Sequence, residues 1–138
     1  MAMTKQEKMR QFNTRGIYGI TAENLSAGRK NRQVVLEMLE AGIRIIQYRE
    51  KKKSMADKYA ECQELRRMTQ DYGALFIIND HPDLCLLSDA DGVHLGQDDY
   101  PVTAVRKLIG GERILGWSTH EPRQLEEAHA LDVAYVGV

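Results

Sequence analysis

The stretch Ala90-Asp91-Gly92-Val93-His94-Leu95-Gly96-Gln97-Asp98-Asp99 is the best guide to the fold of this chain. It is typical of a short buried strand that ends abruptly in a polar, acidic loop. Upstream, Leu75-Phe76-Ile77-Ile78-Asn79-Asp80 has the same form. In a parallel sheet such strand ends share one edge, so we expect Asp80 and Asp99 to lie side by side there. Paired carboxylates at that edge are suited to holding a hard cation.

Strand-type and helix-type segments alternate along the rest of the sequence. Strands are predicted over 16–20, 43–48, 74–78, 92–95, 114–116 and 133–138. Helices are predicted over 4–12, 31–41, 54–72, 82–87, 101–109 and 122–130. Asn31 and Ser54 are suited to cap two of these helices, and Gly42 and Gly73 to end them. All three prolines fall at predicted helix starts, where a missing N–H costs little.

This alternation, with apolar strands, indicates an α/β fold whose parallel sheet is covered by helices. An open doubly wound sheet and a closed (β/α)₈ barrel both fit the pattern. In both, function collects at the carboxyl ends of the strands. At 138 residues the chain is the size of one domain, so residues 1–138 are predicted to form a single domain. Residues 1–13 would be a leading helix or extension.

Composition narrows the class of function. The chain has 19 basic and 20 acidic side chains, which argues against a general nucleic-acid binder but leaves room for a local phosphate site. Apolar runs are too short for a membrane span, and residues 1–13 lack the apolar core of a signal peptide. Cys62 and Cys85 lack metal or redox spacing. We therefore expect a cytoplasmic protein with no membrane partner.

The first candidate group is Gln47-Tyr48-Arg49-Glu50-Lys51, which follows Ile45-Ile46. Alternate residues of an extended chain share a face, so Gln47, Arg49 and Lys51 can point together. An arginine fork and a lysine point charge suit a pyrophosphate. The alternative is an ordinary solvated basic loop, because two further lysines extend the run.

The second candidate group is Asn79 and Asp80 together with Asp99. One or two carboxylates plus substrate phosphates are the usual ligands of Mg²⁺. The alternative is that each aspartate caps a helix, since Asp80 precedes Pro82 and Asp99 precedes Pro101.

The third candidate group is Leu115-Gly116-Trp117-Ser118-Thr119-His120. The G-x-S-x-G elbow of serine hydrolases is absent, so Ser118 is better interpreted as a hydroxyl donor to an anion. The alternative is N-terminal capping by Ser118 or Thr119. His94 lies mid-strand, which favours a hydrogen-bonded structural histidine.

The segments 47–51, 78–80, 90–99 and 115–120 closely resemble the thiamine-phosphate synthase family in order and spacing, over residues 17–138. The resemblance implies a (β/α)₈ barrel, present here as about its first six units. It implies a transferase that joins hydroxymethylpyrimidine pyrophosphate to thiazole phosphate and releases pyrophosphate. By the same resemblance, Gln47, Arg49, Lys51, Asn79 and Ser118 bind the substrate, Asp80 and Asp99 hold Mg²⁺, and Arg49, Lys51 and Ser118 stabilise the departing pyrophosphate.

Two departures from the family pattern leave alternatives open. The family barrel has eight strands, six are counted here, and the last two would bind the thiazole phosphate. The chain is therefore expected to be an N-terminal portion, inactive or impaired if it ends at Val138. A thiazole tautomerase of the same fold, or a non-catalytic partial barrel completed by a partner chain, are the alternatives. The expected partners are small-molecule substrates, and a homo-oligomer stays open.

Overall fold

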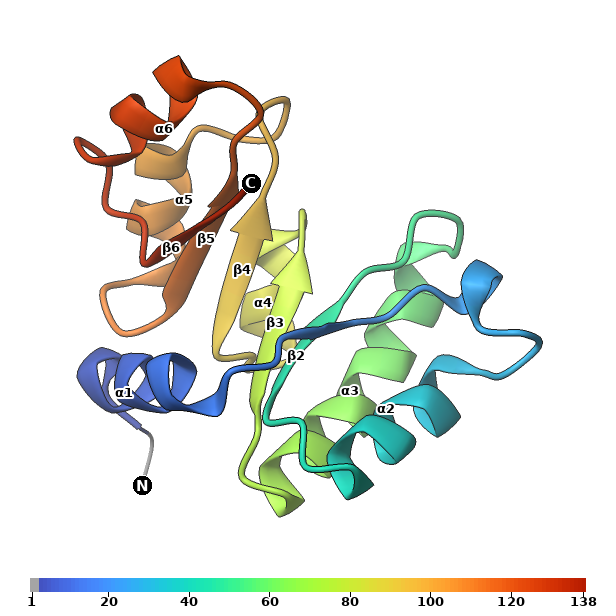
Figure 1. Cartoon of the computed structure of the whole chain (residues 1–138). Helices are drawn as coiled ribbons and strands as arrows, with labels where there is room; N and C mark the ends of the chain where they lie inside the picture. The colour runs from blue at the N-terminus through green and yellow to red at the C-terminus, as the bar shows by residue number, and fades with distance from the viewer. Residues whose placement is uncertain (1–2) are drawn as a thin grey trace.

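The computed structural model describes residues 3–138, in which six parallel strands follow one another in chain order around a curled sheet (Figure 1). The strands are β1 (Gly19–Ile20), β2 (Ile45–Tyr48), β3 (Leu75–Asn79), β4 (Gly92–Leu95), β5 (Ile114–Ser118) and β6 (Tyr135–Gly137). A doubly wound sheet would reverse its strand order at a switch point. The uninterrupted order β1-β2-β3-β4-β5-β6 therefore decides for part of a (β/α) barrel, and that prediction is confirmed.

Six helices and one short 3₁₀ turn connect or precede these strands. They are α1 (Lys5–Arg15), η1 (Glu23–Leu25), α2 (Asn31–Glu40), α3 (Met55–Asp71), α4 (Pro82–Leu87), α5 (Val102–Ile109) and α6 (Pro122–Ala128). Figure 1 shows α2 to α6 on the outer face of the curl and α1 below its lower end. Across residues 3–138, no helix has the length and apolar character needed to span a membrane.

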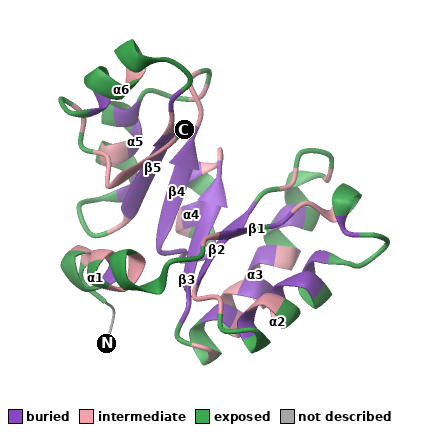
Figure 2. Ribbon diagram, in the orientation of Figure 1, coloured by how far each residue is buried: buried purple, intermediate pink, exposed green. Residues whose placement is uncertain are grey.

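The central strands β2, β3 and β4 are buried on both faces, as Figure 2 shows, whereas the edge strands β1 and β6 are only partly buried. In β3, Phe76 and Ile78 pack under the outer helices, whereas Leu75 and Ile77 point into the curl. This alternation follows from the two-residue period of a strand. The inner apolar cluster is small, and the rings of Phe12, Tyr18 and Tyr135 pack against it. A ligand bound inside the curl would therefore lie next to an apolar surface.

The predicted boundaries hold for most elements and fail at the sheet edges. Gly42 and Gly73 adopt positive φ just past their helices, as expected of helix stops. The first and last strands are shorter than predicted, because each has only one neighbour to pair with. The capping role expected of Asn31 is wrong: Lys30 is the N-cap, and the Asn31 amide donates to Glu50 and Glu61 instead.

Ser54 is the N-cap of α3, as predicted, and its Oγ accepts from the backbone N–H of Asp57 at 3.1 Å. Replacing Ser54 with alanine should lower the free energy of unfolding by about 1 kcal/mol, because that N–H loses its partner. Urea denaturation checks the value. Ser54→Asp retains a capping oxygen and should keep most of the stability, and an equal loss in both variants would contradict the capping argument.

Helix α1 closes the amino-terminal end of the curl. It begins with a capping box at Thr4, and the Gln11 amide donates to the carbonyl of Gly73 at 2.8 Å. Phe12 reaches the interior and stacks on Tyr135, with ring centroids 4.7 Å apart. The leading helix is thus longer than the predicted 4–12, and Met1 and Ala2 of the predicted extension lie outside the described residues.

Candidate functional site

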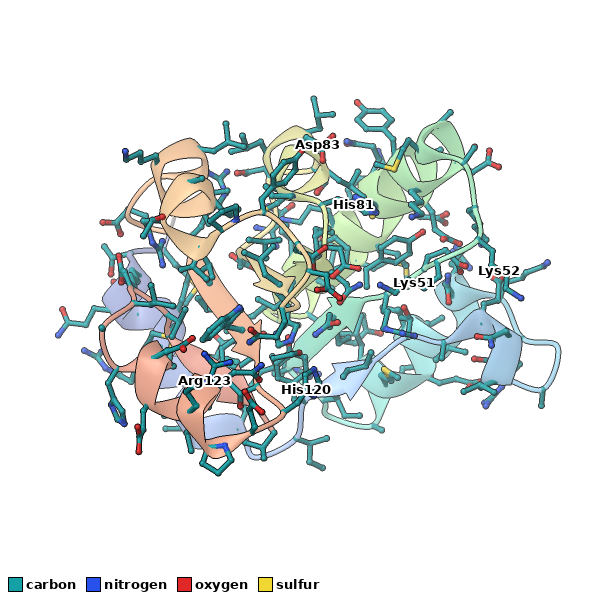
Figure 3. All side chains as sticks on the ribbon, turned by 90° about the horizontal axis from the view of Figure 1, so that it is seen from above. Lys51, Lys52, His81, Asp83, His120 and Arg123 are labelled. Atoms are coloured by element: carbon teal, nitrogen blue, oxygen red, sulfur yellow. The ribbon has the colours of Figure 1, made fainter. Side chains whose placement is uncertain are left out.

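The polar residues singled out in the sequence lie at the carboxyl end of the sheet. Asn79 and Ser118 are the last residues of β3 and β5, and Gln47 lies one residue before the end of β2. Figure 3 looks onto this end from above and shows Lys51 and His120 on the two arms of the curl. Lys52, from the same basic run, lies at the periphery. The strand ends therefore gather the predicted groups around one opening.

A cavity of about 610 Å³ lies at this opening. Its polar lining comes from Gln47, Arg49, Asn79, His94, Ser118 and His120. Its apolar lining includes the rings of Phe12, Tyr18 and Tyr135. Pockets of this size, with an apolar wall and a few convergent polar groups, are typical of small-molecule sites.

Buried Thr21, just after β1, fixes the backbone that carries Gln47 and Arg49. Its N–H donates to the carbonyl of Gln47 at 3.0 Å. Its hydroxyl accepts from the Arg49 N–H at 2.9 Å and donates to the Arg49 carbonyl at 3.2 Å. The backbone of Arg49 is therefore held in place by hydrogen bonds, although the residue itself is exposed.

Lys51 is separated from Gln47 and Arg49, with which it was expected to share a face. Strand β2 ends at Tyr48, so the two-residue alternation does not extend as far as Lys51. The ammonium of Lys51 contacts the carboxylate of Asp80 instead. Of the predicted basic group, only Gln47 and Arg49 line the cavity, and Lys51 belongs to the carboxylate pair beside it.

Asp80 and Asp99 come together as predicted: both line one small pocket, and each carboxyl group shifts the pKa of the other. The Asp80 N–H donates to the carbonyl of His94 at 2.8 Å, which holds the loop after β3 against β4. Asp80 has φ 68°, a left-handed conformation that aspartate tolerates better than most residues. Asp99 Oδ2 accepts from the N–H of Gly96 at 2.6 Å.

The alternative role of these two aspartates as helix caps is wrong. Helix α4 has His81 as its N-cap and α5 has Pro101, and neither helix receives a hydrogen bond from a capping side chain. The Asp80 carboxylate instead contacts Lys51, and the Asp99 carboxylate accepts from the Gly96 N–H.

Burial and neighbouring charge act in opposite directions on the two carboxyl groups. Burial disfavours the ionised form of Asp80, but contact with Lys51 and Asp99 outweighs it and lowers the pKa of Asp80. Burial and the neighbouring Asp80 carboxylate raise the pKa of Asp99 above the usual range. The two carboxyl groups are therefore harder to ionise together than separately, and a divalent cation between them would favour the ionised form of both.

The donor set suits Mg²⁺ rather than an all-protein metal cage. Within residues 3–138 there is no cluster of three or more histidine, cysteine, aspartate or glutamate side chains suited to hold a metal. Magnesium characteristically binds one or two carboxylates and completes its shell with water and substrate phosphates. Asp80 and Asp99, beside a cavity that carries Arg49, match that arrangement.

Ser118 does not cap the following helix, because α6 has Glu121 as its N-cap without a side-chain cap. The Ser118 hydroxyl lies 2.7 Å from Nε2 of His94, and the Thr119 hydroxyl donates to the Gly137 carbonyl. The capping alternative for both residues is therefore wrong. His94 is hydrogen-bonded through both ring nitrogens, as expected of a structural histidine, but its partners place it in the cavity wall.

The sequence model of a family described as Thiamine monophosphate synthase matches residues 17–138. This chain belongs to that family. It is 52% identical to the thiamine-phosphate synthase of Caldicellulosiruptor saccharolyticus over 100% of this chain and 62% of the relative. It is 56% identical to that of Pelotomaculum thermopropionicum over 88% of this chain and 56% of the relative. The chain thus spans about three fifths of the length of these relatives.

A solved structure has the same fold as this chain. The thiamine phosphate pyrophosphorylase from Pyrococcus furiosus superposes with a TM-score of 0.80 at 34% identity, over 87% of this chain and 57% of that one. Within the thiamine monophosphate synthase family, this chain therefore corresponds to part of a longer fold.

Sequence reasoning missed the aromatic part of the cavity. Phe12, Tyr18 and Tyr135 come from the two ends of the chain, and no local motif marks them. One signal was present: Gly116 lies inside a strand, where glycine often marks the close approach of another group. A Cβ at Gly116 would lie 2.2 Å from the Tyr135 ring, so this glycine makes room for the tyrosine.

Proposed function

We propose that this chain forms the pyrimidine-pyrophosphate side of a thiamine-phosphate synthase. The reaction joins hydroxymethylpyrimidine pyrophosphate to thiazole phosphate and releases pyrophosphate, in the cytoplasm. The observation that carries the proposal is the adjacency of two features at one sheet edge: a cavity with Arg49 at its wall, and the Asp80–Asp99 pair beside it. A cation-dependent pyrophosphate site needs both features.

Each polar group has a role in this proposal. Arg49 and Lys51 attract the pyrophosphate oxygens, Arg49 through its fork and Lys51 as a point charge. The amides of Gln47 and Asn79 and the hydroxyl of Ser118 orient the substrate in the cavity. Asp80 and Asp99 would hold Mg²⁺, which supplies positive charge next to the phosphate oxygens when bound.

The chemistry is a substitution at the methylene carbon of the pyrimidine. The bond from that carbon to the pyrophosphate oxygen breaks first, and the electron pair leaves with the oxygen. A bond from the thiazole nitrogen to the carbon then forms. Negative charge grows on the departing oxygen, so Arg49, Lys51 and Ser118 stabilise the transition state more than the bound substrate.

Replacing Arg49 with alanine should weaken Mg²⁺-dependent binding of the pyrimidine pyrophosphate by about 10- to 100-fold, since charge-assisted hydrogen bonds are about twice as strong as neutral ones. Calorimetric titration with and without Mg²⁺ measures the change. The matched control is Arg32→Ala, which removes an exposed arginine paired with Glu64 on the outer helices and should bind like the parent chain.

The same titration separates the alternatives. Binding that ignores both Mg²⁺ and Arg49 would refute the proposed site. Binding of a thiazole ligand alone, unaffected by neutralising Asp80, would point to a tautomerase, which has no pyrophosphate to hold.

A further inference from the structure

Five side chains form an unbroken line of hydrogen bonds across the wall of the cavity. Gln47 Nε2 donates to the Tyr18 hydroxyl at 3.0 Å, and the Tyr18 and Tyr135 hydroxyls are 2.6 Å apart. The Tyr135 hydroxyl is 2.9 Å from Nδ1 of His94, and Nε2 of His94 is 2.7 Å from the Ser118 hydroxyl. The line begins at Gln47 in β2 and ends at Ser118 in β5. Between them, Tyr18 directly precedes β1, Tyr135 belongs to β6 and His94 belongs to β4.

The first bond favours one direction for all the others, because it leaves the Tyr18 hydrogen free. Tyr18 accepts from Gln47, so its own hydrogen is free to go to Tyr135. Tyr135 then donates to Nδ1 of His94, which must carry a lone pair. His94 holds its hydrogen on Nε2 and donates to Ser118. The hydroxyl hydrogen of Ser118 is left over and can be given to a ligand.

The opposite direction has a different outcome at the ligand end. Ser118 would donate to His94, and His94 would donate through Tyr135 toward Tyr18. Tyr18 would then accept from both Gln47 and Tyr135, and its hydrogen would have no acceptor within residues 3–138. The Ser118 hydrogen would also be used up inside the wall.

We propose that the line Gln47–Tyr18–Tyr135–His94 holds His94 as its Nε2–H tautomer and so reserves the Ser118 hydroxyl hydrogen for an oxyanion in the cavity. Tyr18 and Tyr135 act as positioning residues, since they reach the ligand only through His94 and Ser118. The identity of the oxyanion as a pyrophosphate rests on the proposed function. The tautomer does not.

The surroundings keep every member of the line in the required form. Burial raises the pKa of Tyr135 well above its ordinary value and raises that of Tyr18, so both phenols keep their hydrogens. Burial lowers the pKa of His94 and so favours the neutral ring. The Tyr135 ring is fixed between Phe12 and His94, at centroid distances of 4.7 and 5.4 Å.

Nitrogen NMR of the imidazole, on the ¹⁵N-histidine-labelled chain without ligand, reads the tautomer directly. We expect the Nε2–H form of His94 in the parent chain. Tyr135→Phe removes the donor to Nδ1 and should reduce the Nε2–H to Nδ1–H ratio by about fivefold, the worth of one hydrogen bond. Gln47→Glu offers only an acceptor at the start of the line and should invert the tautomer to Nδ1–H.

Tyr100→Phe is the matched control, because Tyr100 is 71% exposed and outside the line, and its His94 signals should not move. An Nδ1–H tautomer in the parent chain would overturn the proposal. So would unchanged ratios in both Tyr135→Phe and Gln47→Glu. Titration of the parent chain with inorganic pyrophosphate and Mg²⁺ is run in parallel. A failure to bind would count against the proposed function and leave the tautomer result standing.

Discussion

Replacing Asp91 with alanine should lower the free energy of unfolding by about 3–5 kcal/mol, the cost of breaking a buried ion pair from one side. Asp91 is 5% exposed and precedes β4 at the closed end of the curl. Its carboxylate accepts from Arg66 at 2.8 and 3.4 Å and from the Phe76 N–H at 2.8 Å. Lys8 of α1 lies 3.4 Å away and is itself buried.

Removal of this one carboxylate leaves the buried Lys8, the partly buried Arg66 and a backbone donor without their partner. We also expect α1 to loosen, because Lys8 is a main anchor of that helix. Urea denaturation gives the stability, and amide hydrogen exchange over residues 5–15 reports on α1.

Asp89→Asn is the matched control, two residues away, because asparagine tolerates the left-handed backbone there. Asp89 pairs with Arg113, but its side chain is 78% exposed, and exposed pairs contribute at most about 1 kcal/mol. Equal losses in the two variants would show that the Asp91 cluster does not anchor the closed end.

The fold was predictable because its signals are local. Strand and helix periods, Ser54 and the glycine stops can each be identified within a few residues, and strand order follows once the alternation is seen. The information that distinguishes an open sheet from a barrel is not local. Length and composition leave both open, and only the resemblance and then the observed strand order decided it.

The site was predictable where it depends on strand ends, and not where it depends on partners far along the chain. Asp80 and Asp99 follow neighbouring strands, so their meeting could be inferred. Tyr18 and Tyr135 are 117 residues apart, and nothing near either one predicts their hydrogen bond. Asp91 was likewise one acid among many, because its cations lie on α1 and α3.

Lys51 shows a second limit. Its spacing from Gln47 and Arg49 predicts a shared face only while the chain stays extended. The strand ends at Tyr48, and the attraction of the Asp80 carboxylate then decides where the ammonium lies. Residue spacing therefore predicts which side chains share a face only within one continuous strand or helix.

Replacing Asp99 with asparagine should stabilise the metal-free chain and remove its stabilisation by Mg²⁺. The raised pKa of Asp99 means that folding favours its protonated form. Its stabilising contribution is present at low pH and is lost as the pH rises through the folded value. Above that point the ionised Asp99 opposes folding, because it faces the Asp80 carboxylate. Asparagine removes the repulsion and also a metal ligand.

Replacing Asp80 with asparagine should also remove the stabilisation by Mg²⁺, but it should not stabilise the metal-free chain. The lowered pKa of Asp80 means that its ionised form stabilises the fold above the unfolded value of about 3.9, and this contribution disappears as the pH falls through the folded value. Asparagine tolerates the left-handed backbone at this position but gives up the contact with Lys51. The variant should therefore be less stable than the parent chain in the absence of metal.

Thermal unfolding with Mg²⁺ and inorganic pyrophosphate tests both variants together. At about 100 times the dissociation constant, ligands should stabilise the parent chain by about 2.7 kcal/mol, and the gain should grow with pH as the proton on Asp99 becomes easier to displace. Asp89→Asn, at another left-handed aspartate, should keep the full gain. If Asp80→Asn or Asp99→Asn also kept this stabilisation, the cation could not be bound by the carboxylate pair, because one carboxylate alone would then be sufficient.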